Sequence, residues 1–315
     1  MRPCFAVTFI AAAAVLSAAA PPQDPAQTPT FRSKTAGVMV DATVRDKTRR
    51  SITGLTAKDF HLTDNGVPQR VDDVSYGKLP IDITVALDVS HSVSGALLDR
   101  LRQAVMQLMD DLGKEDRLKL VLFNMRVRRI MDYTRDVKTV ERAIRSATAG
   151  GGTSLLDAIS VTLVSDSAPD RRQLAVFFTD GSDSTSTTSH DMVVTVAQRA
   201  RATLAFVVPS AGRVISVTGT GATSFSLPTS ASASLRIPNH PLLQSLTRET
   251  GGTILPVGPS ANLSSAFKSV LAEFRAAYVL YYTPRGVDRE GYHRLEVTVN
   301  RENAQVQARR GYFSY

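Results

Sequence analysis

Four short runs of the sequence are apolar along almost their whole length. They are ITVALDV at 83–89, LKLVLFN at 118–124, LAVFFTD at 174–180 and TLAFVVP at 203–209. A strand of this kind is buried on both faces, as in a parallel sheet covered by helices on both sides. Segments with apolar residues at helical spacing separate the runs. The alternation predicts an open, mostly parallel α/β sheet of Rossmann-like type with helices on both faces.

The connecting and following segments complete this expected domain, which spans residues 80–276. Helices are predicted at 94–112, 136–148, 154–164, 189–201, 240–250 and 261–275, with an edge strand at 127–133 and a short strand at 253–257. Residues 210–238 interrupt the pattern, because they are rich in Ser, Thr, Gly and Ala and have no clear periodicity. A stretch of this length inside a compact domain indicates a surface insertion, with a binding loop as the alternative.

The two flanks of this domain have the shorter, alternating pattern of antiparallel strands. Residues 36–79 predict a small β unit, with a strand at 38–44, extended pieces at 52–55 and 59–62, a tight turn at Asn65-Gly66 and the return strand at 71–76. Residues 277–315 predict strands at 278–284, 294–300 and 304–310. Because the two ends of a domain often lie close together, we expect the C-terminal β unit to pack with residues 36–79.

The N-terminus indicates export, to the periplasm or the outside of the cell. Met1 and Arg2 precede a short apolar run and then small residues, which is typical of a secretory signal peptide over 1–19. Residues 20–35 are rich in Pro and Gln and predict a linker. The sole cysteine, Cys4, lies in the signal peptide, so the mature chain has no disulfide. No later stretch is long and apolar enough for a transmembrane segment.

Composition excludes a mostly disordered or fibrous chain, since 43% of residues are hydrophobic and 21% are charged. Lys and Arg number 37 and Asp and Glu 29, a net charge of +8. This modest, scattered excess permits a polyanionic partner without requiring one, and we expect no nucleic acid. Arg126, Arg128 and Arg129 lie on the expected edge strand, where charge protects against pairing with other strands or binds polyanions.

Oxygen-bearing side chains lie at the ends of two of the apolar runs and just before one expected helix. The apolar run at 83–89 leads into Asp-Val-Ser-His-Ser, a glycine-rich segment precedes a helix, and the run at 174–180 ends in an acid. The side chains concerned are Asp88, Ser90, Ser92, Thr153 and Asp180. The carboxyl ends of parallel strands share one edge of a sheet, where ligands gather. Carboxylate and hydroxyl oxygens suit a hard divalent cation, Mg²⁺ first, with Mn²⁺ or Ca²⁺ as alternatives.

This pattern resembles the metal-ion-dependent adhesion site (MIDAS) of von Willebrand factor A (VWA) domains, which is Asp-x-Ser-x-Ser followed by a distant Thr and a distant Asp. The phrases VALDVSHS, GGGTSLLDAI and VFFTDGSD are similar to that family, and the flanks resemble exported bacterial VWFA-related proteins. The resemblance implies that Ser90, Ser92 and Thr153 bind the cation directly, and that Asp88 and Asp180 act through water. It also implies a non-enzymatic, metal-dependent protein-binding module whose partner supplies an Asp or Glu.

Other interpretations stay open at this point. The five residues could instead cap helices, and the domain could be a metal-free structural or assembly module. A serine hydrolase would need Ser90 or Ser92 to meet a remote histidine such as His190 or His240, and the sequence has no Gly-x-Ser-x-Gly elbow. Gly150-Gly151-Gly152 lacks the lysine of a phosphate-binding loop.

Overall fold

The computed structural model describes residues 37–164, 168, 170–209, 240–258 and 260–315. The expected signal peptide (1–19), linker (20–35) and insertion (210–238) lie outside the described residues. No helix in the described part of the chain has both the length and the apolar character needed to span a membrane.

The central sheet is open and mostly parallel, as predicted. Among the described residues its strand order is β10-β9-β8-β5-β6-β7, and only β7 runs antiparallel to its neighbour. The strands are β5 (Ile81–Asp88), β6 (Arg117–Phe123), β7 (Val127–Thr134), β8 (Arg172–Phe178), β9 (Thr203–Pro209) and β10 (Thr253–Val257). All eight residues of β5 are buried, which explains why its sequence is apolar on both faces.

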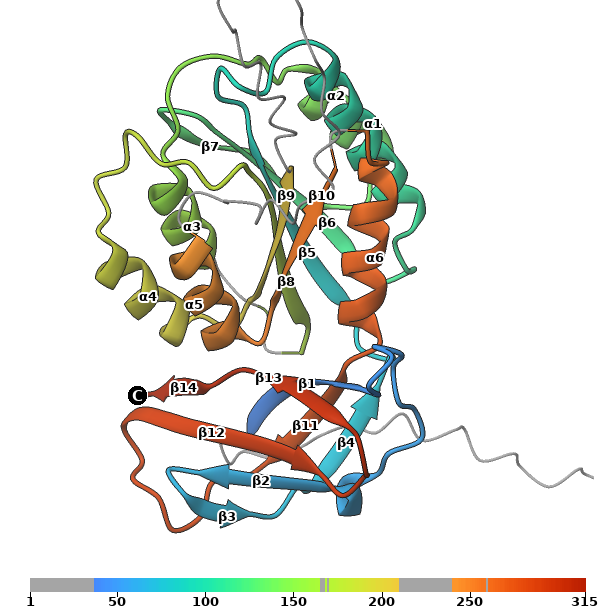
Figure 1. Cartoon of the computed structure of the whole chain (residues 1–315), viewed down its shortest axis with the longest axis vertical. Helices are drawn as coiled ribbons and strands as arrows, with labels where there is room; N and C mark the ends of the chain where they lie inside the picture. The colour runs from blue at the N-terminus through green and yellow to red at the C-terminus, as the bar shows by residue number, and fades with distance from the viewer. Residues whose placement is uncertain (1–36, 165–167, 169, 210–239, 259) are drawn as a thin grey trace, which may run out of the picture. The chain divides into compact units, whose positions relative to one another are not determined.

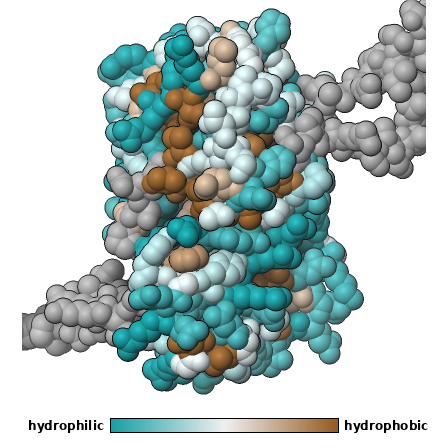
Figure 2. Space-filling view, turned by 90° about the vertical axis from the view of Figure 1, so that its left-hand side faces the viewer, coloured by the Kyte–Doolittle hydropathy of each residue, from teal (hydrophilic) through white to brown (hydrophobic). Residues whose placement is uncertain are grey.

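Helices cover both faces of this sheet (Figure 1). One face carries α1 (Ala96–Asp110), α2 (Val137–Arg145) and α6 (Leu263–Arg275), and the other carries α3 (Leu155–Leu163), α4 (His190–Arg199) and α5 (His240–Thr250). Successive side chains of a strand point to opposite faces, so Val85 joins the first apolar cluster and Ala86 the second. Figure 2 looks at the side that carries α3 and α4, where hydrophobic patches lie among hydrophilic ones.

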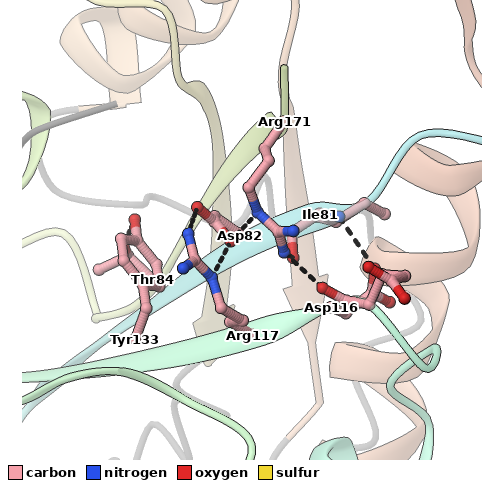
Figure 3. A network of polar contacts seen from close by, with 8 residues as sticks. Ile81, Asp82, Thr84, Asp116, Arg117, Tyr133 and Arg171 are labelled. Atoms are coloured by element: carbon pink, nitrogen blue, oxygen red, sulfur yellow. Dashed lines mark hydrogen bonds and ion pairs between the residues drawn. The ribbon is translucent and has the colours of Figure 1, made fainter. Parts of the chain in front are cut away.

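A buried ionic network fixes the strand starts, at the edge opposite the candidate site (Figure 3). Asp82 is 1% exposed and accepts hydrogen bonds from Arg117 and Arg171. Asp116 accepts one from the backbone N–H of Ile81 and another from Arg275. These pairs offset the cost of burying the two carboxylates, and they link the starts of β5, β6 and β8.

The flanking segments form two small antiparallel sheets around a third apolar cluster. One has the order β13-β1-β11-β4 and the other β14-β12-β2-β3. Their strands are β1 (Val38–Arg45), β2 (Phe60–Asp64), β3 (Val67–Gln69), β4 (Asp73–Tyr76), β11 (Tyr278–Tyr282), β12 (Gly291–Val299), β13 (Gln305–Ala308) and β14 (Gly311–Ser314), with a 3₁₀ turn at Ala57–Asp59. Strands from both flanks therefore pair directly, as β1 does with β11 and β2 with β12.

Three details of the β prediction were wrong. The turn at Asn65-Gly66 leads into β3, whereas residues 71–76 supply β4 of the other sheet. Residues 52–55 form no strand, because their backbone bonds the Tyr278 hydroxyl instead: Ile52 accepts from it and Leu55 donates to it. The expected strand at 304–310 is β13, and the strand β14 that follows it, in the other sheet, was not predicted.

Two strands that pair with each other connect the α/β domain to the flanking sheets. β4 precedes it and β11 follows it, and Tyr76 lies opposite Tyr278 in their ladder. Arg172, the first residue of β8, joins the domain to the β strands. It is 1% exposed, donates to the Asp41 carboxylate at 2.7 Å and to the Phe274 carbonyl at 2.7 Å, and stacks on the Phe274 ring.

Candidate metal-binding site at the carboxyl edge of the sheet

Asp88 is the last residue of β5, and its side chain is completely buried. Its carboxylate accepts a hydrogen bond from the backbone N–H of Ser90 at 2.9 Å and one from the Thr179 hydroxyl at 3.2 Å. The first bond turns the chain sharply after the strand, and the second joins this turn to the end of β8. Asp88 is thus held at the centre of the sheet's carboxyl edge.

Ser90 and Ser92 lie on this turn with their hydroxyl oxygens 3.1 Å apart. Ser90 is buried and Ser92 is exposed, so the pair spans from the interior to the surface. The N–H of Val93 donates to the Ser90 carbonyl at 3.0 Å, which closes a second turn. The turn therefore presents two hydroxyls and one carboxylate within five residues.

Thr153 reaches the same edge on the glycine-rich segment before α3. The N–H of Gly150 donates to the Val89 carbonyl, and the N–H of His91 donates to the Gly151 carbonyl, so this segment lies against the Asp88–Ser92 turn. Thr153 is itself buried, and its backbone N–H donates to the Ser184 hydroxyl at 3.0 Å. Within the described residues, no hydrogen bond joins the Thr153 side chain to Asp88 or to the two serines.

Asp180 follows β8, two residues beyond its last strand position. Its carboxylate accepts from the backbone N–H of Ser182 at 2.8 Å. The charge of Asp180 acts on Asp88, so the two carboxylates are electrostatic neighbours. The structure thus brings Asp88, Ser90 and Ser92 into direct contact and places the segments bearing Thr153 and Asp180 beside them.

Burial raises the pKa of Asp88 above its ordinary value, and the charge of Asp180 acts in the same direction. Hydrogen bonds from Ser90 and Thr179 oppose this rise. Among the described residues, no Lys, Arg or His forms an ion pair with Asp88 or Asp180. A completely buried carboxylate without a cationic partner is unfavourable, so the missing positive charge is the property that a bound cation would supply.

The donor set fits a hard cation that accepts hydroxyl ligands. In the described part of the chain, no three His, Cys, Asp or Glu side chains gather closely enough to hold a metal ion by themselves. Two carboxylates and three hydroxyls are oxygen donors of the kind that Mg²⁺ uses, usually together with water. The residues present therefore fit Mg²⁺ better than they fit a softer metal such as zinc.

None of the five site residues caps a helix. The N-cap residues of α1, α3 and α4 are Gly95, Ser154 and Ser189. The start of α3 is held from outside, because the Asp183 carboxylate accepts from the N–H of Leu155 at 2.8 Å. The capping interpretation of the five residues therefore fails, and their side-chain oxygens are not used by helix ends.

Three further residues support the site in ways that the sequence pattern did not predict. Thr179 positions Asp88, Asp183 holds the start of α3 behind Thr153, and Asp157 on α3 accepts from the N–H groups of Thr187 and Thr188. Asp157 thus fastens the segment after Asp180 to α3. The only sequence signal for these roles was the density of Ser, Thr and Asp at 179–188.

The serine hydrolase interpretation receives no geometric support. The Ser90 hydroxyl bonds the Ser92 hydroxyl, and within the described residues neither serine bonds a histidine ring. His190 begins α4 and His240 begins α5.

An open parallel sheet with helices on both faces and an oxygen-rich turn after its central strand is the architecture of VWA-type α/β domains. The family model of the von Willebrand factor type A domain matches residues 82–217, and the chain therefore contains a VWA domain. VWA domains are commonly protein-interaction or adhesion modules and are generally non-enzymatic.

A solved structure shares the fold. The von Willebrand factor type A protein from Catenulispora acidiphila is 11% identical with a TM-score of 0.50, over 89% of this chain and 75% of that one. The conserved hypothetical protein BatB from Bacteroides thetaiotaomicron is 15% identical with a TM-score of 0.47, over 62% of this chain and 98% of that one.

One curated relative, the uncharacterized protein sll0103 of Synechocystis, is 27% identical over 108 residues. The match covers 33% of this chain and 26% of the relative, so this chain corresponds to about a quarter of that protein's length.

Proposed function

We propose that this protein binds a divalent cation, Mg²⁺ first, at Asp88, Ser90, Ser92, Thr153 and Asp180, and through it the Asp or Glu side chain of a protein partner. The observation that carries this proposal is the completely buried Asp88 carboxylate, which has hydroxyl and N–H partners but no cationic one. The buried Asp88 carboxylate at the carboxyl end of β5 and the exposed Ser92 hydroxyl together give the site a buried and an open side.

Each residue has a distinct part in this proposal. Ser90, Ser92 and Thr153 offer hydroxyl oxygens to the cation, while Asp88 and Asp180 supply negative charge and orient water. A bound divalent cation would supply the positive charge that attracts a partner carboxylate and strengthens that contact. The chain performs no chemistry on the partner, and the contact acts as one anchor inside a larger interface. Export through residues 1–19 belongs to the same proposal.

Calorimetric titration of Mg²⁺ into the metal-stripped protein tests the site. We expect saturable one-site binding that Asp88→Ala abolishes, with the far-ultraviolet circular dichroism spectrum unchanged. Asp191→Ala is the matched control, because Asp191 is an exposed acid on α4. Full Mg²⁺ affinity in Asp88→Ala would reject the site. Silence of the wild-type protein at millimolar Mg²⁺ would favour the metal-free assembly module instead.

A further inference from the structure

We propose that the turn at 124–126 and the adjoining strand β7 form a recognition surface for an acidic protein segment. We call this surface the arginine edge and define it as Met125, Arg126, Arg128 and Arg129. The inference rests on the proposed function, because it assigns the flanking residues of the same partner whose carboxylate binds at the cation. It adds a chemical class to that partner, namely a segment with several acidic residues around one apolar residue.

The turn is fastened to the candidate metal site by backbone and amide contacts. The Asn124 side chain donates to the Gly150 carbonyl at 2.8 Å, and the N–H of Ser154 donates to the Asn124 carbonyl at 2.7 Å. The N–H of His91 in turn donates to the Gly151 carbonyl. The arginine edge therefore begins directly beside the two segments that carry Ser90, Ser92 and Thr153.

Positive charge is concentrated on this edge. Residues 124–131 contain three arginines and no acid. Arg126 and Arg128 are exposed, and among the described residues no carboxylate pairs with their guanidinium groups. Arg129 pairs with Asp132 at 3.4 Å, with both side chains largely exposed. Two guanidinium groups are thus available to carboxylates, which they bind in a planar, bidentate manner.

Met125 adds an apolar contact next to the cation site. Its side chain is 57% exposed and lies on the glycine-rich segment, with its sulfur 3.2 Å from where a Cβ on Gly151 would be. Because Gly151 has no side chain, Met125 can pack flat against the segment that leads to Thr153. Methionine adapts its shape to different apolar groups, so it suits a residue beside the anchoring carboxylate.

A protein segment fits this surface better than a nucleic acid does. Exposed aromatic side chains, on which bases stack, are absent from the described part of the turn and of β7; the most exposed ones are Tyr292 on β12 and Tyr315 after β14. The edge position of β7 leaves its outer side open to a partner segment.

The test measures peptide preference by fluorescence polarisation in the presence of Mg²⁺. The probes are two labelled peptides of equal length, each with a central Asp followed by Leu. The first has Glu at alternating flanking positions, and the second has Gln at those positions. Since exposed charge pairs contribute modestly, we expect the wild-type protein to bind the first peptide roughly two- to thirtyfold more tightly. Added salt should reduce that preference.

Arg126→Gln with Arg128→Gln should remove the preference. The matched control is Arg248→Gln with Arg289→Gln, which changes the net charge equally at two exposed positions elsewhere. The inference is overturned if the first pair keeps the preference, if the control loses it equally, if neither peptide binds, or if a DNA duplex binds more tightly than the acidic peptide with the same dependence on Arg126 and Arg128.

The same experiment separates this inference from the proposed function. Asp88→Ala and EDTA report on the cation, whereas the arginine variants report on the flanking acids. A preference that survives EDTA but not Arg126→Gln with Arg128→Gln would support the arginine edge and reject the metal anchor. Mg²⁺ binding measured by calorimetry, without any preference for flanking Glu, would support the metal anchor and reject the arginine edge.

Discussion

The hydroxyl of Thr179 donates to the carboxylate of Asp88 at 3.2 Å, across 91 positions of the chain. Both side chains are completely buried. Thr179 is also tied to β9, since its N–H donates to the Val207 carbonyl. The orientation of the central site carboxylate thus depends on a residue that does not itself belong to the expected ligand set.

Thr179→Val should weaken Mg²⁺ binding without unfolding the protein. The substitution removes the hydroxyl but keeps the branched shape, and loss of a residue that orients a metal ligand costs about 10- to 100-fold in affinity. Thr179→Ser keeps the hydroxyl and should stay within about threefold of wild type, because one preserved hydrogen bond carries most of the effect. Calorimetry with Mg²⁺ measures both; equal affinity in all three proteins would show that Asp88 needs no such support.

Gly152→Ala should damage the site by pushing two loops apart. A Cβ at residue 152 would lie 2.9 Å from Ser184 Oγ and 2.9 Å from Thr185 Cγ2. Ser184 accepts the hydrogen bond of the Thr153 N–H, so relief of the clash displaces Thr153. Overpacking of this kind costs about 1–3 kcal/mol. We expect a lower midpoint in urea and weaker Mg²⁺ binding.

Gly258→Ala is the control for this clash, because nothing lies within 4 Å of the Cβ that it would add. It should leave both the urea midpoint and the Mg²⁺ affinity unchanged. If Gly152→Ala behaves like this control, the two loops can separate freely.

Asp116 should make stability depend on acid pH. Burial acts to raise the pKa of Asp116, but hydrogen bonds from Arg275 and from the N–H groups of Ile81 and Gly113 outweigh it and lower the pKa. A carboxyl group whose pKa is lower in the folded state contributes stability above its unfolded pKa of about 3.9, and this contribution disappears as pH falls through the folded value.

Urea unfolding of wild type and Asp116→Asn at neutral and acid pH measures this contribution. We expect Asp116→Asn to cost about 1–3 kcal/mol at neutral pH, the usual range for hydrogen bonds to a charged group. The difference between the two proteins should shrink on acidification below about pH 4, where wild-type Asp116 becomes protonated. A difference that is constant over this range would mean that Asp116 is not ionised in the folded protein.

Arg172→Met should strongly destabilise the junction between the α/β domain and the flanking strands. It removes a buried cation from Asp41 and from the Phe274 carbonyl, and breaking a buried pair costs about 3–5 kcal/mol. Adding Asp41→Asn should recover part of the loss, because it removes the unpaired charge. Arg50→Met is the control: Arg50 pairs with Asp46 but its side chain is 79% exposed, so we expect a change below about 1 kcal/mol.

The central sheet could be predicted because its sequence signal is local. Runs such as 83–89 are apolar at consecutive positions, and only a strand buried on both faces requires that pattern. The turn bearing Asp88, Ser90 and Ser92 follows such a run directly. The approach of this turn to the glycine-rich segment could also be expected, since both lie at the carboxyl edge of one sheet.

The supporting contacts could not be predicted in the same way. Thr179, Asp183 and Arg172 act on partners 28 to 131 positions away, and such distances leave no periodic signal. The same holds for Asp64, which is completely buried and accepts from the hydroxyls of Tyr282 and Tyr312 beside His293. Alternation shows that a segment is a strand but not which sheet it joins, which is why 71–76 was placed with the wrong partner.

The direct ladder between β1 and β13 also determines how the protein carries a mechanical load. Ala42 lies opposite Ala308 and Arg45 opposite Gln305. A strand that precedes the α/β domain is therefore joined directly to a strand that follows it, without passing through residues 81–275. Tension applied between residue 38 and residue 314 would be borne by these backbone hydrogen bonds, which must rupture before the α/β domain is stretched. The candidate cation site is therefore mechanically shielded from a pull along the chain, while a pull on a bound partner would act on it directly.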